Sequence, residues 1–241
     1  MGSKLTEKEW IRRKSMKKAS RIFLIIILMI CIIGLSVFFI GGIFKDYLNK
    51  SKNTTEVLSS RLLNGIEVKQ MYLTPNDYSR PQMPLKKVKG IVVHYTANPG
   101  TSAENNQSYF ESLAEKGTTY ASSHYIIGLE GEIVQCIPMT EISYASNDRN
   151  KDTISIENCH PDETGEFTSE TYNSLVALTA ALCVEYDLGE EDILSHYDIT
   201  GKLCPLYFVE HEDAWKAFRR EVMIKKALLN SKIDMIDNDF N

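Results

Sequence analysis

The chain has 241 residues, of which 43% are hydrophobic and 24% are charged, a composition typical of one globular domain plus some non-globular sequence. Its net charge of −5 is unevenly distributed, because residues 1–21 contain eight lysines or arginines and only two glutamates. A basic N-terminal stretch beside an acidic remainder argues against nucleic acid as a partner and favours a membrane boundary between the two parts.

An uncharged apolar run, residues 22–44, follows the basic stretch. About 20 such residues suffice for a helix that crosses a bilayer. A cleaved signal peptide would have a shorter apolar region ending at small residues, and a buried core helix would carry some polar residues, so both alternatives are less favoured. Because lysine and arginine precede the run, the sequence predicts a single-pass signal anchor in the cell membrane, with residues 1–21 cytoplasmic and all later residues extracellular.

Residues 45–84 predict an extracellular stalk or linker. A polar stretch and a short apolar patch lead into a segment with Pro75, Pro81 and Pro84, which makes a continuous helix improbable. The folded domain is predicted at residues 85–228, and residues 229–241 are expected to be an acidic tail.

Alternating strand-like and helix-like segments fill residues 85–228. Expected strands lie within 87–97, 123–137 (two strands turning near Glu130 and Gly131) and 152–159. Expected helices lie at 101–116, 167–188 and 212–229, the last with a core stripe of Trp215, Phe218 and Val222. This order predicts an α/β domain with a central mixed β-sheet flanked by helices.

Three residues stand out as possible metal ligands. His94 ends an apolar strand, and His196 and Cys204 lie in the segment SHYDITGKLCP. Zinc favours imidazole nitrogen and thiolate sulfur, and a catalytic zinc site has three protein ligands and one open position. Each residue alone is weak support, because a single buried histidine or cysteine is more often structural.

Two charged residues accompany these candidate ligands. Glu157 ends the apolar strand TISIENC, where an ionised carboxylate is costly unless it is paired or functional. Beside a metal it could act as a general base, and Lys202, two residues before Cys204, could stabilise an oxyanion. A strand-end salt bridge for Glu157 and a solvated loop charge for Lys202 are the simpler alternatives.

Four segments together resemble the N-acetylmuramoyl-L-alanine amidase family. They are IVVHYTANPG, SSHYIIGLEGEIVQCIP, DTISIENCHPDETGEF and SHYDITGKLCP. The resemblance is to the type 2 group, which shares its fold with phage amidases and animal peptidoglycan recognition proteins, and it covers roughly residues 84–225. It implies a Zn²⁺ ion held by His94, His196 and Cys204, with Glu157 as the catalytic base and Lys202 as an assisting residue.

The chain also departs from the family pattern. Ser123 stands where some relatives have a catalytic tyrosine, which favours dependence on Glu157, and Tyr144 stands where many relatives have a histidine in a WHAG-like segment. His124 and Tyr144 are candidate substrate-binding residues, although a structural role for His124 is equally open. His160 and His211 have no motif and are expected at the surface.

The implied function is zinc-dependent hydrolysis of the amide between the N-acetylmuramoyl lactyl group and L-alanine of peptidoglycan. A non-catalytic peptidoglycan-binding module and an amidase acting on another stem-peptide bond remain alternatives. The expected partners are peptidoglycan and, through one helix, the lipid bilayer; a monomeric ectodomain is favoured. Three further cysteines beyond the apolar run, Cys136, Cys159 and Cys183, are expected to be small buried residues, with one disulfide left open.

Overall fold

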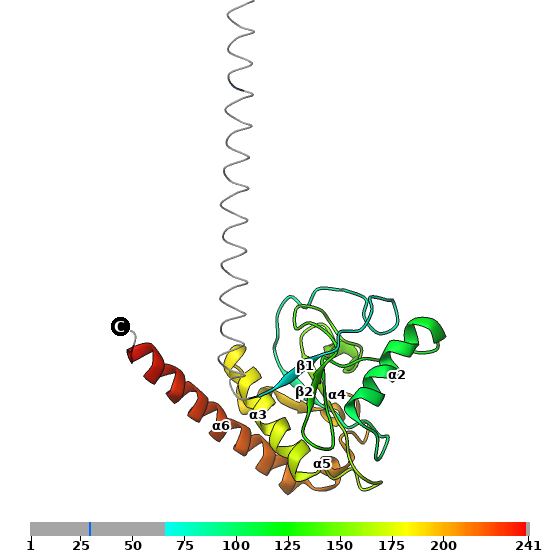
Figure 1. The fold of residues 1–241 in the computed structure, drawn as a ribbon. Coiled ribbons are helices and arrows are strands. Elements are labelled where there is room, and N and C mark those ends of the chain that lie inside the picture. The colour runs from blue at the N-terminus through cyan, green and yellow to red at the C-terminus, as the bar shows by residue number, and fades with distance from the viewer. Residues whose placement is uncertain (1–28, 30–65, 240–241) are drawn as a thin grey trace, which may run out of the picture. The chain divides into compact units, whose positions relative to one another are not determined.

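The computed structural model describes residue 29 and residues 66–239 of the chain (Figure 1). The basic segment 1–21, the apolar run 22–44 apart from Met29, and the linker up to residue 65 therefore lie outside the described residues. Among the described residues, no helix is both long enough and apolar enough to cross a membrane.

Six short strands form one mixed sheet with the spatial order β1-β4-β3-β5-β2-β6. They are β1 (Val68–Gln70), β2 (Ile91–Val93), β3 (Tyr125–Ile127), β4 (Ile133–Gln135), β5 (Ile154–Asn158) and β6 (Ile193–Ser195). All neighbouring strands run parallel except β3 and β4, which form an antiparallel hairpin. The hairpin turns through Gly131, whose φ of 83° suits glycine, as expected from the sequence.

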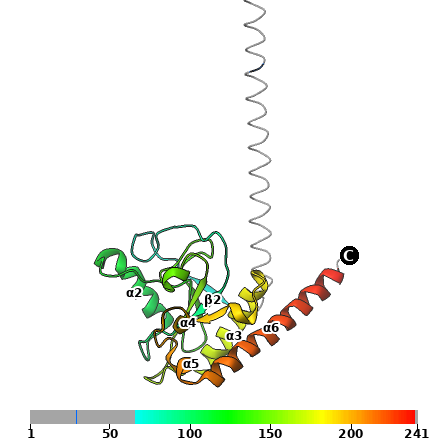
Figure 2. The same cartoon turned by 180° about the vertical axis from the view of Figure 1, so that it is seen from behind.

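Helices cover both faces of this sheet. They are α2 (Ala103–Lys116), α3 (Ser169–Glu185), α4 (His196–Thr200), α5 (Leu206–Glu210) and α6 (Glu212–Asp239), with short 3₁₀ turns η1 (Asn147–Arg149) and η2 (Glu190–Asp192). Figures 1 and 2 place α2 on one side of the strands and α3 with α6 on the other. The structure thus confirms the predicted α/β architecture with a central mixed sheet.

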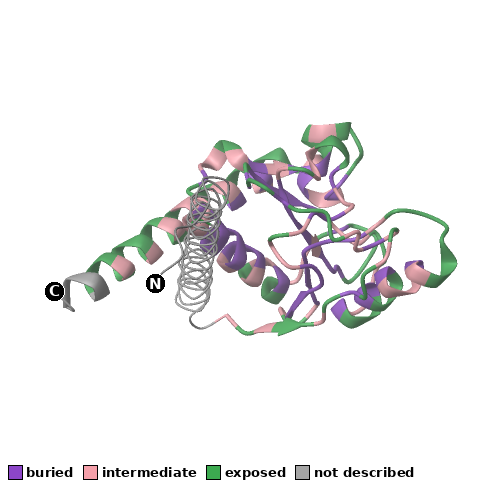
Figure 3. Cartoon of the chain, turned by 90° about the horizontal axis from the view of Figure 1, so that it is seen from above, coloured by how far each residue is buried: buried purple, intermediate pink, exposed green. Residues whose placement is uncertain are grey.

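Alternate residues of the strands pack into two separate hydrophobic clusters. Tyr125 and Ile127 of β3 join the cluster formed with α3 and α6, whereas Ile126 packs with Phe110 and Leu113 of α2. Figure 3 shows the buried residues concentrated in the strands and on the inner sides of the helices. Because the inner strands β2, β3 and β5 are largely buried on both faces, they read in the sequence as mostly apolar runs, whereas edge strand β1 exposes Lys69 and Gln70.

Helix α2 begins and ends at residues suited to those positions. The Ser102 side chain accepts a hydrogen bond from the backbone N–H of Asn105 at 3.2 Å, and Gly117 closes the helix with a φ of 58°. Of the two caps expected from the sequence, Thr101 and Ser102, the structure uses Ser102.

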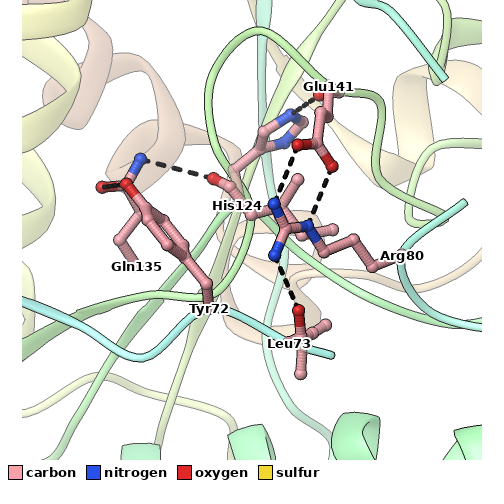
Figure 4. Close-up of polar contacts among 7 residues, drawn as sticks. Tyr72, Leu73, Arg80, His124, Gln135 and Glu141 are labelled. Atoms are coloured by element: carbon pink, nitrogen blue, oxygen red, sulfur yellow. Dashed lines mark hydrogen bonds and ion pairs between the residues drawn. The ribbon is translucent and has the colours of Figure 1, made fainter. Parts of the chain in front are cut away.

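Residues 66–84, predicted as part of the linker, fold against the domain. Strand β1 pairs with β4 in parallel, and Leu73 is fully buried. Arg80 forms a two-pronged ion pair with Glu141 at 2.8 and 2.9 Å and donates to the Leu73 carbonyl oxygen at 2.8 Å (Figure 4). The folded unit therefore begins before residue 85. The sequence did not predict this start, because a three-residue edge strand is too short to show a recognisable periodicity.

The C-terminal helix differs from its prediction in length. Trp215, Phe218 and Val222 form the expected core stripe of α6. The helix continues to Asp239, so most of the segment 229–241 that was expected as a tail is helical. No proline or glycine interrupts residues 212–239, and exposed acidic residues are compatible with a solvated helix surface.

Candidate metal centre

The carboxyl ends of three neighbouring parallel strands gather the predicted site residues. Strand β2 lies between β5 and β6, with Val93 in register with both Ile156 and Ser195. His94 directly follows β2, His196 directly follows β6, and Glu157 is the penultimate residue of β5. In open α/β sheets this edge is the usual position of a binding site.

His94, His196 and Cys204 form one compact buried cluster. Their candidate ligand atoms all lie within 4.8 Å of one another. The Cys204 Sγ atom is 3.8 Å from His94 Nδ1, and the two imidazole rings are 4.7 Å apart between centroids. Two imidazoles and a thiol converging in this way match the three-ligand set of a catalytic zinc site.

Two adjacent loop residues contact the outer nitrogens of both histidines. Ser146 Oγ lies 3.2 Å from His94 Nε2, and Asn147 Oδ1 lies 3.2 Å from His196 Nε2. An amide oxygen accepts only, so His196 Nε2 donates the hydrogen bond and its Nδ1 is left with a lone pair. Such contacts orient metal-binding imidazoles. Sequence reasoning missed both residues, and their only signal was their position just after Tyr144.

The protonation states in the cluster suit a cation. Burial, followed by the charges of His196 and Lys202, holds the pKa of His94 well below its usual value. Burial also lowers the pKa of His196, so both imidazoles are neutral at pH 7. Burial raises the pKa of the Cys204 thiol to about 12, so a thiolate there requires a positive ion. The donor set therefore fits zinc.

Glu157 lies beside this cluster with an unsatisfied carboxylate. Its Oε2 atom is buried and has no hydrogen-bond partner among the described residues. Burial raises the pKa of Glu157 to about 8, while the charge of Lys202 lowers it. A nearby cation would lower this pKa further and favour the ionised base. No residue between 66 and 239 forms a salt bridge with this carboxylate, so it could take part in proton transfer.

Lys202 is an exposed residue of the loop that joins α4 to α5. The backbone N–H of Cys204 donates to the Lys202 carbonyl oxygen at 2.7 Å, which closes a tight turn between them. The Lys202 charge lowers the pKa of both ligand histidines and of Glu157. The structure thus brings Lys202 within electrostatic reach of the site.

His124 does not reach the site surface. It is fully buried, and its Nδ1 accepts from the Ser155 backbone N–H at 3.0 Å. Its Nε2 must then carry the proton and donates to the Glu141 carbonyl oxygen at 2.9 Å (Figure 4). Of the two roles left open by the sequence, these contacts favour the structural one.

The remaining candidates divide between surface and interior. Tyr144 is partly exposed two residues before Ser146, and its ring contacts Tyr120. His211 is exposed as expected, but the expectation for His160 is wrong: it is buried against the Tyr95 ring, with Nδ1 donating to the Asp162 carbonyl oxygen at 2.7 Å. Cys136, Cys159 and Cys183 are buried free thiols, so no disulfide forms among them.

A mixed sheet that gathers two histidines and a cysteine at its carboxyl edge defines a class of protein with a candidate metal site. The chain belongs to the N-acetylmuramoyl-L-alanine amidase family, because the model of that family matches residues 84–206, about half of the sequence. The match contains all three ligand residues together with Glu157 and Lys202.

Individual relatives agree with this assignment. The chain is 35% identical over 170 residues to the N-acetylmuramoyl-L-alanine amidase CwlL of Bacillus licheniformis, covering 65% of this chain and 47% of the relative. It is 32% identical over 175 residues to the amidase BlyA of Bacillus subtilis (strain 168), covering 64% and 46%. The chain thus spans about half the length of these curated relatives.

Solved structures show the same fold. The structure of PlyL matches with a TM-score of 0.56 and 26% identity, over 65% of this chain and 97% of that one. The solution structure of the PlyG catalytic domain matches with a TM-score of 0.57 and 26% identity, over 67% and 96%. The domain described here therefore corresponds to nearly the whole of each of those solved chains.

Proposed function

We propose that the chain is a zinc-dependent peptidoglycan amidase that cleaves the bond between the N-acetylmuramoyl lactyl group and L-alanine. The observation that carries this proposal is the buried cluster of His94, His196 and Cys204 beside the unpaired carboxylate of Glu157. Relatives named as N-acetylmuramoyl-L-alanine amidases support the choice of bond.

His94, His196 and Cys204 would hold the zinc ion. When bound, the ion would supply a Lewis acid that polarises the amide carbonyl and makes water easier to ionise. Ser146 and Asn147 keep the two imidazoles oriented through their outer nitrogens. Three protein ligands would leave the fourth position of the ion for water or the substrate carbonyl.

The chain's own residues account for the proton transfers. Glu157 accepts a proton from the attacking water as the water oxygen bonds to the carbonyl carbon. Lys202 stabilises the negative charge that develops on the carbonyl oxygen. Glu157 then delivers the proton to the alanine nitrogen as the carbon–nitrogen bond breaks, which leaves a lactyl carboxylic acid and a free amine; transfer of the acid proton to the amine gives the carboxylate and the ammonium.

Digestion of purified peptidoglycan by the intact chain tests this function. Zinc-dependent release of stem peptides with a free N-terminal L-alanine, lost on chelation and regained with zinc, is the expected result. Glu157→Gln should bind zinc but lose roughly 100-fold or more in turnover, as for loss of a general base. Release of peptides cut elsewhere would redirect the specificity, and zinc binding without hydrolysis would instead favour a peptidoglycan-binding module.

We also propose that the apolar run 22–44 anchors this activity to the outer face of the cell membrane. The support is the length of the run and the basic residues before it. Membrane fractionation of the intact chain and of a variant lacking residues 1–44 tests the anchor. The intact chain should sediment with membranes and resist salt extraction, whereas recovery of both forms in the soluble fraction would refute it.

A further inference from the structure

Three tyrosines from distant parts of the sequence form a continuous aromatic surface, here termed the tyrosine ridge. The rings of Tyr78 and Tyr120 stack with centroids 5.3 Å apart, and Tyr120 meets Tyr144 in an edge-on contact at 5.4 Å. Tyr120, the central residue, is 62% exposed. Large aromatic side chains in such a position mark interaction sites more often than isolated exposed residues do.

Backbone contacts hold the three segments of the ridge together. The N–H of Ala121 donates to the Tyr78 carbonyl oxygen, and the N–H of Ser122 donates to the Tyr144 carbonyl oxygen, both at 3.1 Å. The Tyr144 N–H returns a bond to Ser122 Oγ at 3.0 Å. The backbone segments that carry the three rings are therefore held together before any ligand arrives, which reduces the entropy lost on binding.

The packing of Tyr78 makes the ridge more rigid. Its ring lies against Gly117 at the end of α2, where an added Cβ would come within 3.2 Å of the Tyr78 Cζ atom and of its hydroxyl oxygen. Gly117 also has a φ of 58°, so both space and backbone conformation favour glycine there. Asp77, next to Tyr78 in the chain, contributes an exposed carboxylate whose charge reaches the Tyr144 hydroxyl.

The ridge is continuous with the metal centre. Tyr144 is two residues before Ser146, whose hydroxyl contacts the imidazole of His94. Two residues span at most about 7 Å, so the ridge begins close to the ligand cluster. A substrate whose scissile amide lies at the cluster could therefore extend over these rings.

We propose that the tyrosine ridge is a glycan subsite, on which sugar rings of the peptidoglycan strand stack against Tyr120. This proposal rests on the proposed function, because it assigns the part of the substrate that lies beside the cleaved amide. Flat aromatic rings offer apolar contact to the C–H faces of sugars, while their hydroxyl groups remain in water. The ridge would thus bind the strand through sugar rings and would be insensitive to the stem-peptide sequence.

Binding of a peptide-free tetrasaccharide of alternating N-acetylglucosamine and N-acetylmuramic acid tests the ridge. Calorimetry on the intact chain, with and without zinc, separates stacking from any contact of the lactyl carboxylate with the metal. Tyr120→Ala should weaken binding roughly tenfold in both states, whereas Tyr120→Phe should bind like the unaltered chain. Tyr109→Ala is the matched control, because Tyr109 is an exposed tyrosine, 48% accessible, on α2.

The outcomes separate the subsite from the reaction. Equal binding by Tyr120→Ala and the unaltered chain, or no binding by either, would overturn the glycan subsite even if hydrolysis is observed. Tyr120-dependent binding without hydrolysis of peptidoglycan would keep the subsite and reject the amidase reaction. In digestion assays, Tyr120→Ala should raise KM and leave kcat nearly unchanged, since the ring does not touch the reacting atoms.

Discussion

Asn147 has an unusual conformation for a residue that contacts a candidate metal ligand. Its φ of 52° is in the left-handed region, which asparagine tolerates better than most residues with a side chain. In this conformation its amide oxygen lies 3.2 Å from Nε2 of His196. The neighbouring Ser146 is held by Asn150 Oδ1, which accepts its backbone N–H at 2.6 Å. One short loop thus fixes both imidazoles.

Removing the Asn147 side chain should weaken zinc binding. Glycine accepts the same backbone conformation, so Asn147→Gly deletes the amide without added strain. Zinc affinity, measured by competition with a chelator, should fall roughly 10-fold or more. Asn147→Asp, which keeps an acceptor oxygen, should restore it. Equal affinities of the glycine variant and the unaltered chain would show that this contact does not orient His196.

His124 should make the stability of the domain depend on pH. Burial lowers its pKa from 6.5 to about 4, so the unfolded chain takes up the proton first as the pH falls. The stabilisation is complete above pH 6.5 and is lost as the pH falls toward 4, on the order of 3 kcal/mol. Urea unfolding of His124→Gln, compared with the unaltered chain, should show a shallower loss over this range. Parallel pH profiles would contradict this assignment.

At the scale of elements, the segment that carries β1 is attached to the sheet by the pair Arg80–Glu141. The two side chains are only 13% and 16% exposed, whereas those of Lys69 and Glu104, a second ion pair of this segment, are 60% and 57% exposed. The Glu141 backbone carbonyl oxygen also accepts from His124. This partly buried pair therefore connects residues 66–84 to His124 in the interior.

Substitution of Arg80 should destabilise the domain far more than substitution of Lys69. Arg80→Met leaves a partly buried carboxylate without its partner and is expected to lower the free energy of unfolding by about 2–4 kcal/mol. Lys69→Met breaks a solvated pair and should cost less than about 1 kcal/mol. Urea denaturation measures both values, and similar costs would mean that Arg80 is not needed to attach the segment.

The predictability of the elements follows their length and pattern. The helices α2, α3 and α6 and the hairpin of β3 and β4 were predicted, because helical periodicity or a glycine turn marks them. Strands β1 and β6 were missed, since three residues are too few to show an alternation. Pairing with a neighbouring strand, rather than local preference, determines such short elements.

In the candidate site, the ligand residues were predictable from the sequence, whereas the residues that contact them were not. His94, His196 and Cys204 came from metal chemistry and from the family resemblance, and the structure places them together. Ser146 and Asn147 act through a loop contact that only the folded chain creates. The sequence likewise left the role of His124 open, because only the folded chain shows that this residue is fully buried.

For the molecule as a whole, the candidate metal centre brings together parts of the chain far apart in sequence. His94 follows β2, His196 begins α4, and Cys204 lies shortly before α5. His94 and Cys204 are therefore 110 residues apart in sequence. A ligand that binds only the folded chain stabilises it by mass action, about 4 kcal/mol at 1,000 times its Kd. Zinc should therefore raise the melting temperature of the entire domain.

Thermal unfolding after chelation tests this coupling. The melting temperature should fall when zinc is removed and recover when it is restored. In Cys204→Ser, which replaces a thiolate ligand by a weak hydroxyl donor, the zinc-dependent shift should be much smaller. A shift of equal size in this variant would place the stabilising ion elsewhere.

The loop between β4 and β5 contacts both the tyrosine ridge and the ligand cluster. Tyr144 belongs to the ridge, while Ser146 and Asn147 contact the imidazoles. If zinc binding restrains this loop and thereby favours saccharide binding, thermodynamic reciprocity requires saccharide binding to favour zinc binding by the same factor. Zinc would then tighten saccharide binding as much as saccharide tightens zinc binding, so that the metal-loaded chain would be retained on glycan strands and the metal-free chain released.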